Sequence, residues 1–266
     1  MDVYGLIGNP VGHSLSPIMH EAGFDAIGLD ARYVTFQPPV DAAGEAVAAA
    51  DLLGVRGLNV TIPFKQAVID HVEPDEEASR IGAVNTIDFQ STPPSGHNTD
   101  ARGAKRALER HDVTIENRTA VLLGAGGAAR AIGFGLMDAG AELVIANRTL
   151  ERAEALAADL GAVRAMSLDT IGDAVDEASL LINATSVGME SNESPVSADV
   201  LHADLVVMDA VYRPLETRLL RDAVDVGAEP IDGAWMLLYQ GVAAFERWTG
   251  RDAPVDTMND ALRESL

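Results

Sequence analysis

The stretch VLLGAGGAAR at residues 121–130 constrains the fold more than any other part of the chain. An apolar run with the pattern of a buried strand ends in a glycine turn, and a helix of small residues follows it. The turn fits G-x-G-x-x-[GA], with Gly124, Gly126 and Ala129 at the defined positions. A strand, a glycine turn and a helix in this order bring backbone N–H groups and a helix N-terminus toward a pyrophosphate. This context favours dinucleotide binding over the alternative, a tight turn that binds no ligand.

Short apolar runs alternate with helical patterns along the whole chain, which predicts an α/β protein with mainly parallel sheets. At 266 residues the chain is long enough for two domains, and no low-complexity linker separates them. The apolar segment 233–249 is expected to form a buried helix. Strands are expected at 3–8, 32–36, 57–62 and 83–89, and again at 119–123, 142–148, 180–185 and 204–212.

Acidic side chains dominate the charge, with 41 Asp and Glu against 19 Lys and Arg and a formal net charge of −22. This balance argues against nucleic acid and anionic membranes as partners, because both require a basic protein surface. The only lysines are Lys65 and Lys105. Such depletion of lysine beside abundant Asp, Glu and Ala is typical of extreme halophiles, in whose brine a Debye length of roughly 3 Å screens self-repulsion.

The composition also excludes several classes of site. With no cysteine there are no disulfides, no thiolate metal sites and no cysteine nucleophile. The six histidines lack metal-ligand spacing, so no metal is expected. No run reaches the roughly 18 to 20 apolar residues of a membrane span. The start MDVYGLIGNP has an acid where a signal peptide has basic residues, so we expect a cytoplasmic protein.

The residues after the second strand of the nucleotide region indicate which cofactor binds. A site that prefers NAD usually has Asp or Glu here, because a carboxylate accepts from the ribose 2′-hydroxyl. This chain has Asn147, Arg148, Thr149 and, one helical turn later, Arg152. A guanidinium binds a 2′-phosphate that a carboxylate would repel, so the charge favours NADP over NAD. The alternative is that the two arginines form ion pairs with glutamates of the following helix.

Nine stretches, in order along nearly the whole chain, together resemble the shikimate dehydrogenase family. None of them is specific alone, since a pattern such as N-x-T-x-P-x-K is short. The stretches are GNPVGHSLSPIMHEAGF (8–24), GLNVTIPFKQ (57–66), GAVNTI (82–87), HNTDARG (97–103), GAGGAAR (124–130), NRT (147–149), NATSVGM (183–189), DAVYRPLETRLL (209–220) and GAWMLLYQG (233–241).

This resemblance implies a fold, a domain division and a reaction. It implies a substrate domain formed by 1–100 plus 237–266, because the C-terminal helices return to the first domain, and a Rossmann-type NADP-binding domain at 101–236. It also implies the reversible reduction of 3-dehydroshikimate to shikimate with NADPH, a step in aromatic amino-acid (chorismate) biosynthesis. Composition and periodicity alone indicate only an acidic α/β protein with a nucleotide loop.

Lys65 and Asp100 are the catalytic residues that the resemblance implies. Reduction of a ketone requires a hydride, a proton for the developing alkoxide and a substrate that is held still. An ammonium at a strand end can stabilise the oxyanion and donate the proton, whereas arginine, with a pKa above about 12, cannot. In the family the aspartate contacts the reacting hydroxyl and orients the ammonium. Which group donates the proton stays open, because a close pair titrates as a unit. The alternatives are a surface lysine with an acidic partner and a helix N-cap aspartate.

Six further residues are expected, by the same resemblance, to hold the substrate. Ser14 and Ser16 would donate to the substrate carboxylate, and Tyr212 would lie near it. The side chains that would read the substrate hydroxyls are Thr61, Asn85 and Gln240. Gln240 falls in an otherwise apolar helix, where a buried amide needs a partner, so contact with a ligand is a reasonable expectation there.

The resemblance also assigns the residues that bind the cofactor, which are Gly124, Ala125, Gly126, Gly127, Ala128, Asn147, Arg148, Thr149, Arg152, Asn183, Thr185, Met189 and Gly233. The last four are expected beside the nicotinamide end, although Asn183 could instead be a turn residue at a strand end. Two positions depart from the family. Ala129 stands where many relatives have Ser, and His97 stands where Tyr is usual.

Two other functions fit parts of the pattern. One is a quinate/shikimate dehydrogenase that uses NAD; the paired serines and the Asn-Arg-Thr stretch favour shikimate and NADP instead. The other is a non-catalytic nucleotide-sensing protein on the same fold, which the presence of both Lys65 and Asp100 opposes. The expected partners are the small-molecule substrate and, in a homodimer, a second copy of the chain.

Overall fold

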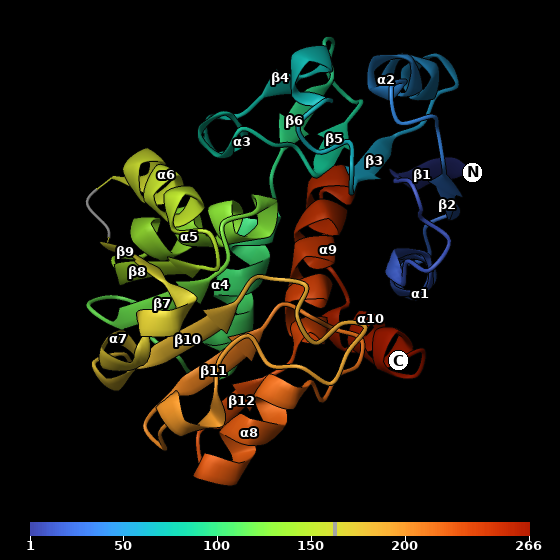
Figure 1. Ribbon diagram of the computed structural model, residues 1–266. Helices are drawn as coiled ribbons and strands as arrows, with labels where there is room; N and C mark the ends of the chain where they lie inside the picture. Colours follow the sequence, from blue (N-terminus) through green and yellow to red (C-terminus); the bar gives the residue numbers. More distant parts are fainter. Residues whose placement is uncertain (162–163) are drawn as a thin grey trace. The chain divides into compact units, whose positions relative to one another are not determined.

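The structure is a computed structural model that describes residues 1–161 and 164–266. The chain divides into two compact units, drawn in Figure 1. The first contains Met1–Thr99 and Gln240–Ser265, and the second contains Asp100–Tyr239 with Leu266. Each unit has its own six-stranded sheet, and helix α9 (Gly233–Thr249) has residues in both units.

The sheet of the first unit is mainly parallel, as the alternation of strands and helices predicts. Its strand order is β2-β1-β3-β5-β6-β4, and β5 runs antiparallel to both of its neighbours. The strands are β1 (Asp2–Ile7), β2 (Ala31–Phe36), β3 (Gly57–Val60), β4 (Glu73–Pro74), β5 (Thr86–Asp88) and β6 (Ser95–His97). The helices are α1 (Ser16–Ala26), α2 (Ala43–Leu52), the 3-10 turn Ile69–His71, α3 (Glu76–Ile81) and α10 (Val255–Arg263).

The two faces of this sheet bury different kinds of side chain. Aliphatic residues of α2, α3 and the strands form one cluster, which includes Val47 and Leu58. Aromatic rings fill the other face, where the Tyr4 ring stacks on Trp248 of α9 at 5.3 Å between centroids. The Trp248 indole also donates a hydrogen bond to the Ile87 carbonyl at 3.0 Å and lies directly over Gly57. The absence of a side chain at Gly57 therefore makes room for the indole.

The sheet of the second unit is parallel throughout the described strands, in the order β12-β11-β10-β7-β8-β9. The order reverses beside β7, as in doubly wound nucleotide-binding sheets. The strands are β7 (Thr119–Leu123), β8 (Glu142–Asn147), β9 (Arg164–Ser167), β10 (Leu180–Asn183), β11 (Val206–Asp209) and β12 (Glu229–Ile231). The helices are α4 (Asp100–Arg110), α5 (Gly127–Asp138), α6 (Leu150–Leu160), α7 (Gly172–Asp176) and α8 (Arg218–Val226), with 3-10 turns at Leu168–Thr170 and Ala198–Val200.

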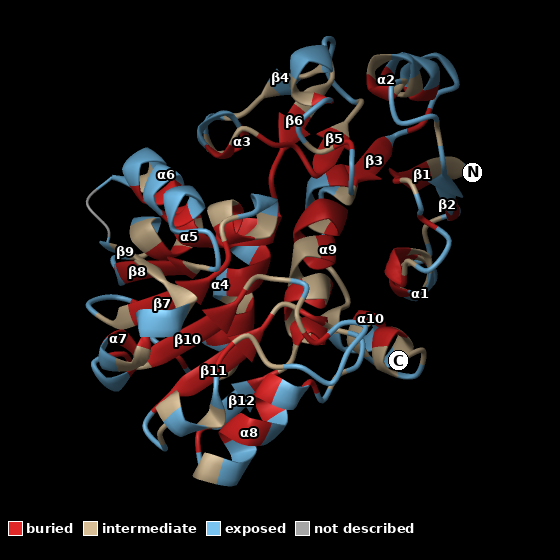
Figure 2. Cartoon of the chain, viewed as in Figure 1, coloured by how far each residue is buried: buried red, intermediate tan, exposed pale blue. Residues whose placement is uncertain are grey.

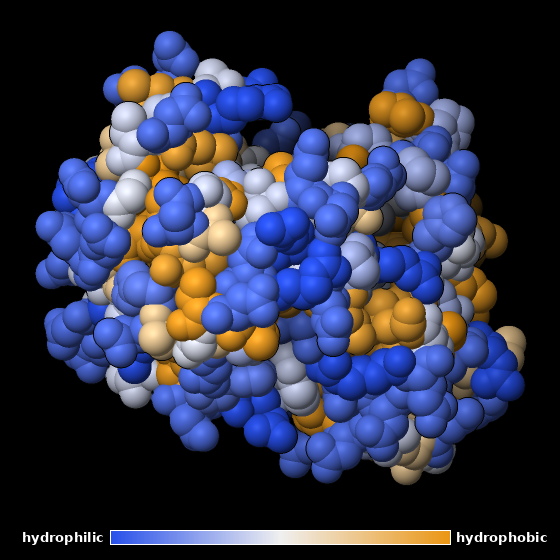
Figure 3. All heavy atoms as spheres, turned by 60° about the horizontal axis from the view of Figure 1, so that its bottom comes forward, coloured by the Kyte–Doolittle hydropathy of each residue, from blue (hydrophilic) through white to orange (hydrophobic). Residues whose placement is uncertain are grey.

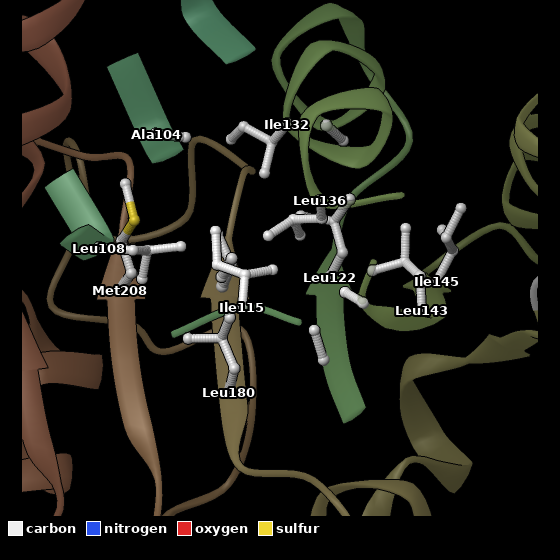
Figure 4. Packing of buried hydrophobic residues seen from close by; sticks show 14 of the residues in the cluster. Ala104, Leu108, Ile115, Leu122, Ile132, Leu136, Leu143, Ile145, Leu180 and Met208 are labelled. Carbon is white, nitrogen blue, oxygen red and sulfur yellow. The ribbon is translucent and has the colours of Figure 1, made fainter. Parts of the chain in front are cut away.

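Helices cover both faces of this second sheet, so its central strands are apolar on both sides. Leu122 of β7 packs in one cluster with Ile132 of α5 and Leu108 of α4, as Figure 4 shows. Its neighbours in the strand, Val121 and Leu123, belong to a second cluster with α7 and α8. Figure 2 accordingly colours β10 and β11 as buried along their length. The polar positions that remain lie where the strands end.

The face drawn in Figure 3 consists mostly of hydrophilic residues, in keeping with the net charge of −22. In the part of the chain that the structure describes, no helix combines the length and the apolar character needed to cross a bilayer.

The contact between Gly57 and Trp248 predicts a large effect of a single methyl group. In Gly57→Ala, the new Cβ would lie 2.3 Å from the indole Nε1, so the ring must shift. Overpacking of this kind costs about 1 to 3 kcal/mol, and we expect the free energy of unfolding in urea to fall by that amount. Gly172→Ala is the control, because its Cβ meets nothing closer than 4.0 Å. Equal stability of the two variants would contradict the packing argument.

Candidate active site

The loop before α1 places both predicted serines in the first unit. The Ser14 hydroxyl oxygen accepts a hydrogen bond from the backbone N–H of Ser16 at 3.2 Å, which holds the turn that starts the helix. Pro17 occupies the first turn of α1, where its missing N–H costs nothing. Ser16 is buried, and Ser14 is partly exposed. This loop therefore fixes two hydroxyl groups close to each other.

The turn after β3 carries Thr61 and Lys65, also in the first unit. The backbone N–H of Thr61 bonds to Ile7 O at 2.9 Å, and Val84 N–H bonds to Lys65 O at 2.8 Å. Backbone hydrogen bonds to neighbouring segments thus fix both ends of the turn. Lys65 is partly buried, whereas the ammonium of Lys105, half-exposed on α4, lies 3.7 Å from Glu109. The two lysines therefore occupy very different surroundings.

Asn85 lies between β3 and the segment after β6, and it is only 2% exposed. Its amide oxygen accepts hydrogen bonds from the Thr99 N–H at 2.8 Å, from the Thr99 hydroxyl at 3.2 Å and from the Thr86 hydroxyl at 3.0 Å. These three donors define the plane of the amide. The amide oxygen of Asn85, a residue predicted to bind the substrate, is thus occupied by hydrogen bonds within the protein.

His97, one of the two departures from the family, has partners on both ring nitrogens. Nδ1 lies 2.6 Å from Asp75 Oδ2, and Nε2 lies 2.9 Å from the Ser95 hydroxyl. Asp75 also accepts from Ala78 N–H at 2.8 Å and so caps α3. Burial of Asp75 opposes its charge, but the hydrogen bonds from His97 and Ala78 outweigh it and lower the pKa of the carboxyl. The histidine thus connects β6 to the start of α3.

The remaining predicted catalytic and substrate residues are divided between the units. Asp100 is the first residue of α4, in the second unit, and is 7% exposed. Tyr212 follows β11 in the same unit, and burial raises the pKa of its phenol. Gln240 lies on the part of α9 that belongs to the first unit. The first unit therefore holds Ser14, Ser16, Thr61, Lys65, Asn85 and Gln240.

The glycine turn between β7 and α5 has the geometry of a phosphate-binding loop. Gly124 has φ +112°, and a Cβ there would lie 3.0 Å from Thr185 Cγ2, so both conformation and packing require glycine. A Cβ at Gly126 or Gly127 would meet no atom within 4 Å. The space above the N-terminus of α5 is therefore open, with Ala125 and the other small residues of the turn around it. Backbone N–H groups at an open helix N-terminus of this kind can bind a phosphate group.

Arg148 lies just after β8 and lines a cavity of about 810 Å³ in the second unit. Leu168 and Val196 supply apolar surface to this cavity, and Asn192 supplies an amide. Among the residues that the structure describes, no salt bridge involves Arg148 or Arg152. The predicted alternative, ion pairs with glutamates of α6, is thus not present. Neither guanidinium is thus engaged in an ion pair, although Asp169, Asp199 and Asp222 line the same cavity as Arg148.

Asn147 and Thr149 shape the turn in which Arg148 lies. The Asn147 amide donates to Thr149 O at 2.9 Å, and Thr149 is the N-cap residue of α6, although its hydroxyl does not bond to the helix. The segment therefore leaves β8 in a defined direction and begins α6 with an uncommitted hydroxyl at its N-terminus. Ala128 and Ala129 lie in the first turn of α5, and Ala129 is fully buried in the core.

Asn183, expected beside the nicotinamide, uses its amide within the protein. The nitrogen donates to Asp209 Oδ1 at 2.9 Å, and the oxygen accepts from the Thr185 N–H at 3.0 Å and from its hydroxyl at 2.7 Å. This arrangement is the strand-end turn that the sequence left as an alternative. Asn183 thus determines the path of the loop that carries Thr185 and Met189, and Met189 is 47% exposed.

Asp209 at the end of β11 was not among the predicted site residues. It accepts from Asn183, from the Val211 N–H at 2.9 Å and from the Thr217 hydroxyl at 2.7 Å. Burial raises the pKa of Asp209 to about 6, although these three hydrogen bonds favour the charged form. Its position at a strand end, in DAVYRP, was the only sequence signal that could have identified it.

Gly233, the first residue of α9, packs against the end of β11. A Cβ at this position would lie 2.5 Å from Val211 O, so the helix could not begin there with any other residue. Close packing alone thus accounts for this glycine. In the described segments, no group of three or more histidine, aspartate or glutamate side chains could hold a metal ion.

A glycine turn after the central strand of a doubly wound parallel sheet gives the second unit the arrangement of a Rossmann-type domain. Three family models match the chain: "Shikimate dehydrogenase substrate binding domain" at residues 6–87, "Shikimate / quinate 5-dehydrogenase" at 104–199 and "Shikimate 5'-dehydrogenase C-terminal domain" at 233–263. The chain belongs to the shikimate dehydrogenase family.

Individual relatives support this assignment over the full length. The chain is 64% identical over 266 residues to "Shikimate dehydrogenase (NADP(+))" of Haloarcula marismortui, which covers 100% of both chains. A crystal structure of a shikimate dehydrogenase in complex with NADP+ matches with a TM-score of 0.95 at 42% identity, covering 99% of this chain and 95% of that one. The Thermus thermophilus enzyme in complex with NADP(H) and shikimate matches with a TM-score of 0.93 at 39% identity, covering 100% of both.

The raised pKa of Asp209 predicts a pH dependence of stability. A carboxyl with a folded pKa of about 6 and an unfolded pKa near 3.8 binds its proton more tightly in the folded state. Its contribution to stability is therefore present below pH 3.8 and is lost as the pH rises to 6, by about 2 to 3 kcal/mol. Asp209→Asn should abolish this change.

The measurement is urea unfolding of the wild type and Asp209→Asn between pH 4 and 7 at constant high salt, with Asp204→Asn, an exposed residue of the same unit, as control. The quantity of interest is the difference in stability between each variant and the wild type. A difference for Asp209→Asn that is flat across this range would contradict the assignment.

Proposed function

We propose that this protein catalyses the reversible NADPH-dependent reduction of 3-dehydroshikimate to shikimate in aromatic amino-acid biosynthesis. The full-length relationship to shikimate dehydrogenases that use NADP carries the proposal. The presence of Lys65 and Asp100, with the open glycine turn and the two unpaired arginines, supports it at the level of individual residues. Turnover of shikimate with NADP, followed by absorbance of NADPH in high salt, is the direct test, with quinate and NAD as comparison substrates.

We assign the substrate to the first unit and the cofactor to the second. Ser14 and Ser16 bind the carboxylate, and Thr61, Asn85 and Gln240 bind hydroxyl groups, with Tyr212 near the carboxylate. The glycine turn holds the pyrophosphate, and Arg148 with Arg152 binds the 2′-phosphate. The residues that shape the nicotinamide end are Asn183, Thr185, Met189 and Gly233.

In the proposed reaction the ammonium of Lys65 stabilises the oxygen of the substrate carbonyl as negative charge develops. NADPH supplies the hydride when it is bound. Asp100 accepts a hydrogen bond from the substrate hydroxyl and orients the lysine, and the pair together provides the proton. The backbone hydrogen bond from Val84 to Lys65 keeps the lysine at a constant position on its turn, which such a role requires.

The remaining properties follow from the charge and the reaction. The net charge of −22 disfavours association with nucleic acid and with anionic membranes. A biosynthetic enzyme of this kind works in the cytoplasm, and we assign it there. We further assign a homodimer, which sedimentation equilibrium would test. The composition and the haloarchaeal relatives are consistent with a halophilic enzyme.

Lys65→Ala should lower kcat by about 100-fold or more while KM for shikimate changes little, because a group that acts on the transition state contributes mainly to kcat. Lys65→Arg should not restore the rate, since a guanidinium does not release a proton. Steady-state kinetics with shikimate and NADP provide both parameters.

Lys105→Ala is the matched control, because it removes the only other lysine from an exposed ion pair. Its kcat and KM should stay within about twofold of the wild type, as expected for a surface pair worth less than about 1 kcal/mol. If Lys65→Ala raised KM and left kcat intact, Lys65 would bind substrate and would not take part in the chemistry.

Arg148→Ala should weaken NADP binding by about 10- to 100-fold and leave NAD binding nearly unchanged, because a charge-assisted hydrogen bond to a phosphate is worth about 1.5 to 3 kcal/mol. Titration calorimetry with each cofactor measures the two dissociation constants. Arg164→Ala is the control, since this arginine is exposed and lies 3.5 Å from Glu177. An equal loss of NADP and NAD would mean that Arg148 does not bind the 2′-phosphate.

A further inference from the structure

Three polar side chains on neighbouring strands of the first sheet form a continuous row of hydrogen bonds. Ser95 and His97 lie two residues apart on β6, so their side chains point to the same face of the sheet. Asp75 follows β4, the strand that pairs with β6 in parallel, and its backbone N–H bonds to Gly96 O at 2.9 Å. His97 Nε2 lies 2.9 Å from Ser95 Oγ, and His97 Nδ1 lies 2.6 Å from Asp75 Oδ2. This is the order of contacts in a Ser-His-Asp triad, in which the histidine removes the proton of the serine.

The carboxyl of Asp75 fixes the direction of these hydrogen bonds. Burial of Asp75 opposes its charge, but the hydrogen bonds from His97 and from the Ala78 N–H lower the pKa of the carboxyl, so at neutral pH it can only accept. His97 Nδ1 must therefore carry a hydrogen, and in the neutral imidazole Nε2 then has a lone pair that faces Ser95. The Ser95 hydroxyl donates to this lone pair. The direction thus starts from a carboxylate and a backbone N–H, neither of which can reverse its role.

The surroundings of Ser95 determine which reagents can approach its hydroxyl. Ser95 is partly exposed, whereas His97 is only 7% exposed, so the nucleophile faces solvent and the base is shielded from it. Glu73 on β4 and Asp88 on β5 pair with Ser95 from either side in the sheet. Two carboxylates beside the hydroxyl repel an anionic reagent. The surface around Ser95 therefore favours an uncharged acyl donor.

We propose that Ser95 is a nucleophilic serine that is acylated by small, uncharged, activated esters, with His97 as its general base. Ser95 Oγ forms a bond to the carbonyl carbon of the ester while His97 Nε2 takes the hydroxyl proton. The bond between that carbon and the leaving oxygen then breaks, and the proton passes from His97 to the leaving group or to solvent. Asp75 touches no reagent and is a positioning residue, which holds His97 in the Nδ1–H tautomer and stabilises the imidazolium. None of the three residues belongs to the set assigned to the shikimate reaction, so the proposal stands apart from that function.

The first test is reaction of the full chain with p-nitrophenyl acetate in high salt, with peptide mass spectrometry to locate the acetyl group. Ser95 should be acetylated about 10-fold or more faster than Ser91, an exposed serine whose hydroxyl donates to Pro93 O at 3.0 Å and has no base beside it. In the chain unfolded by urea the two serines should react alike, because the row of hydrogen bonds is then lost. A folded chain in which Ser95 reacts no faster than Ser91 would overturn the proposal.

Substitutions of the nucleophile and the base test their roles through the release of p-nitrophenolate. Ser95→Ala should abolish the fast phase of release, and Ser91→Ala, the matched control, should retain it. His97→Gln should slow acetylation of Ser95 by about 100-fold, because a positioned general base contributes roughly 100-fold or more to such a step. Acetylation of Ser95 at the wild-type rate in His97→Gln would mean that the hydroxyl reacts without a base, which contradicts the proposal.

Asp75→Asn tests the positioning role, because it keeps the shape of the side chain. The Ala78 N–H requires the amide oxygen, so the amide nitrogen faces His97 and the imidazole must take the Nε2–H tautomer. That tautomer cannot accept the proton of Ser95, and acetylation should slow by about 10-fold or more. Nitrogen-15 NMR of the His97 ring reports the tautomer directly, with hydrogen on Nδ1 in the wild type and on Nε2 in Asp75→Asn. An unchanged rate, or hydrogen on Nε2 in the wild type, would overturn the assignment.

Discussion

The carboxyl ends of buried parallel strands impose the constraint on which both units depend. Inside the second sheet, apolar side chains on both faces exclude water, and the polar residues of its described strands lie at the strand ends. Thr61 follows β3, the glycine turn follows β7, and Asn183 and Asp209 end β10 and β11. Each of these strands places one polar group or turn at the carboxyl edge of its own sheet. The fold therefore gathers functional side chains from distant parts of the sequence without a dedicated loop for each.

Several of these features could be predicted from the sequence, because they have strong local signals. The glycine turn was predicted from its spacing between an apolar run and a helix, and the structure has it between β7 and α5. The buried helix 233–249 was predicted with the bounds that the structure has. The preference for NADP was predicted from the arginines after β8, because the charge of these side chains can be read from the sequence without knowledge of the tertiary structure. Lys65 was noticed because the chain has so little lysine.

Other features depend on contacts that no local pattern encodes. The short strands β4, β6, β9 and β12 have two to four residues each, which is too few for a local pattern, and they are defined by their pairing with neighbouring strands. Asp209 resembles an ordinary strand residue in the sequence, and its role at the strand end follows from its hydrogen bond to Asn183, 26 residues away. Gly233 was expected beside the cofactor, whereas its packing against Val211 already requires glycine. Such roles become visible only when the partners are known.

The position of Trp248 over Gly57 has a consequence for folding during synthesis on the ribosome. The first unit is made of the first and the last segments of the chain, with the whole second unit between them. During synthesis the strands of the first sheet and Phe24 of α1 emerge early, but Trp248 of α9, which packs on the same face, emerges near the end. Until α9 is synthesised, Gly57 lacks the indole that packs on it, and Tyr4 has only part of its aromatic cover. Because exposed apolar surface promotes association between nascent chains, the packing of α9 also removes a site of aggregation.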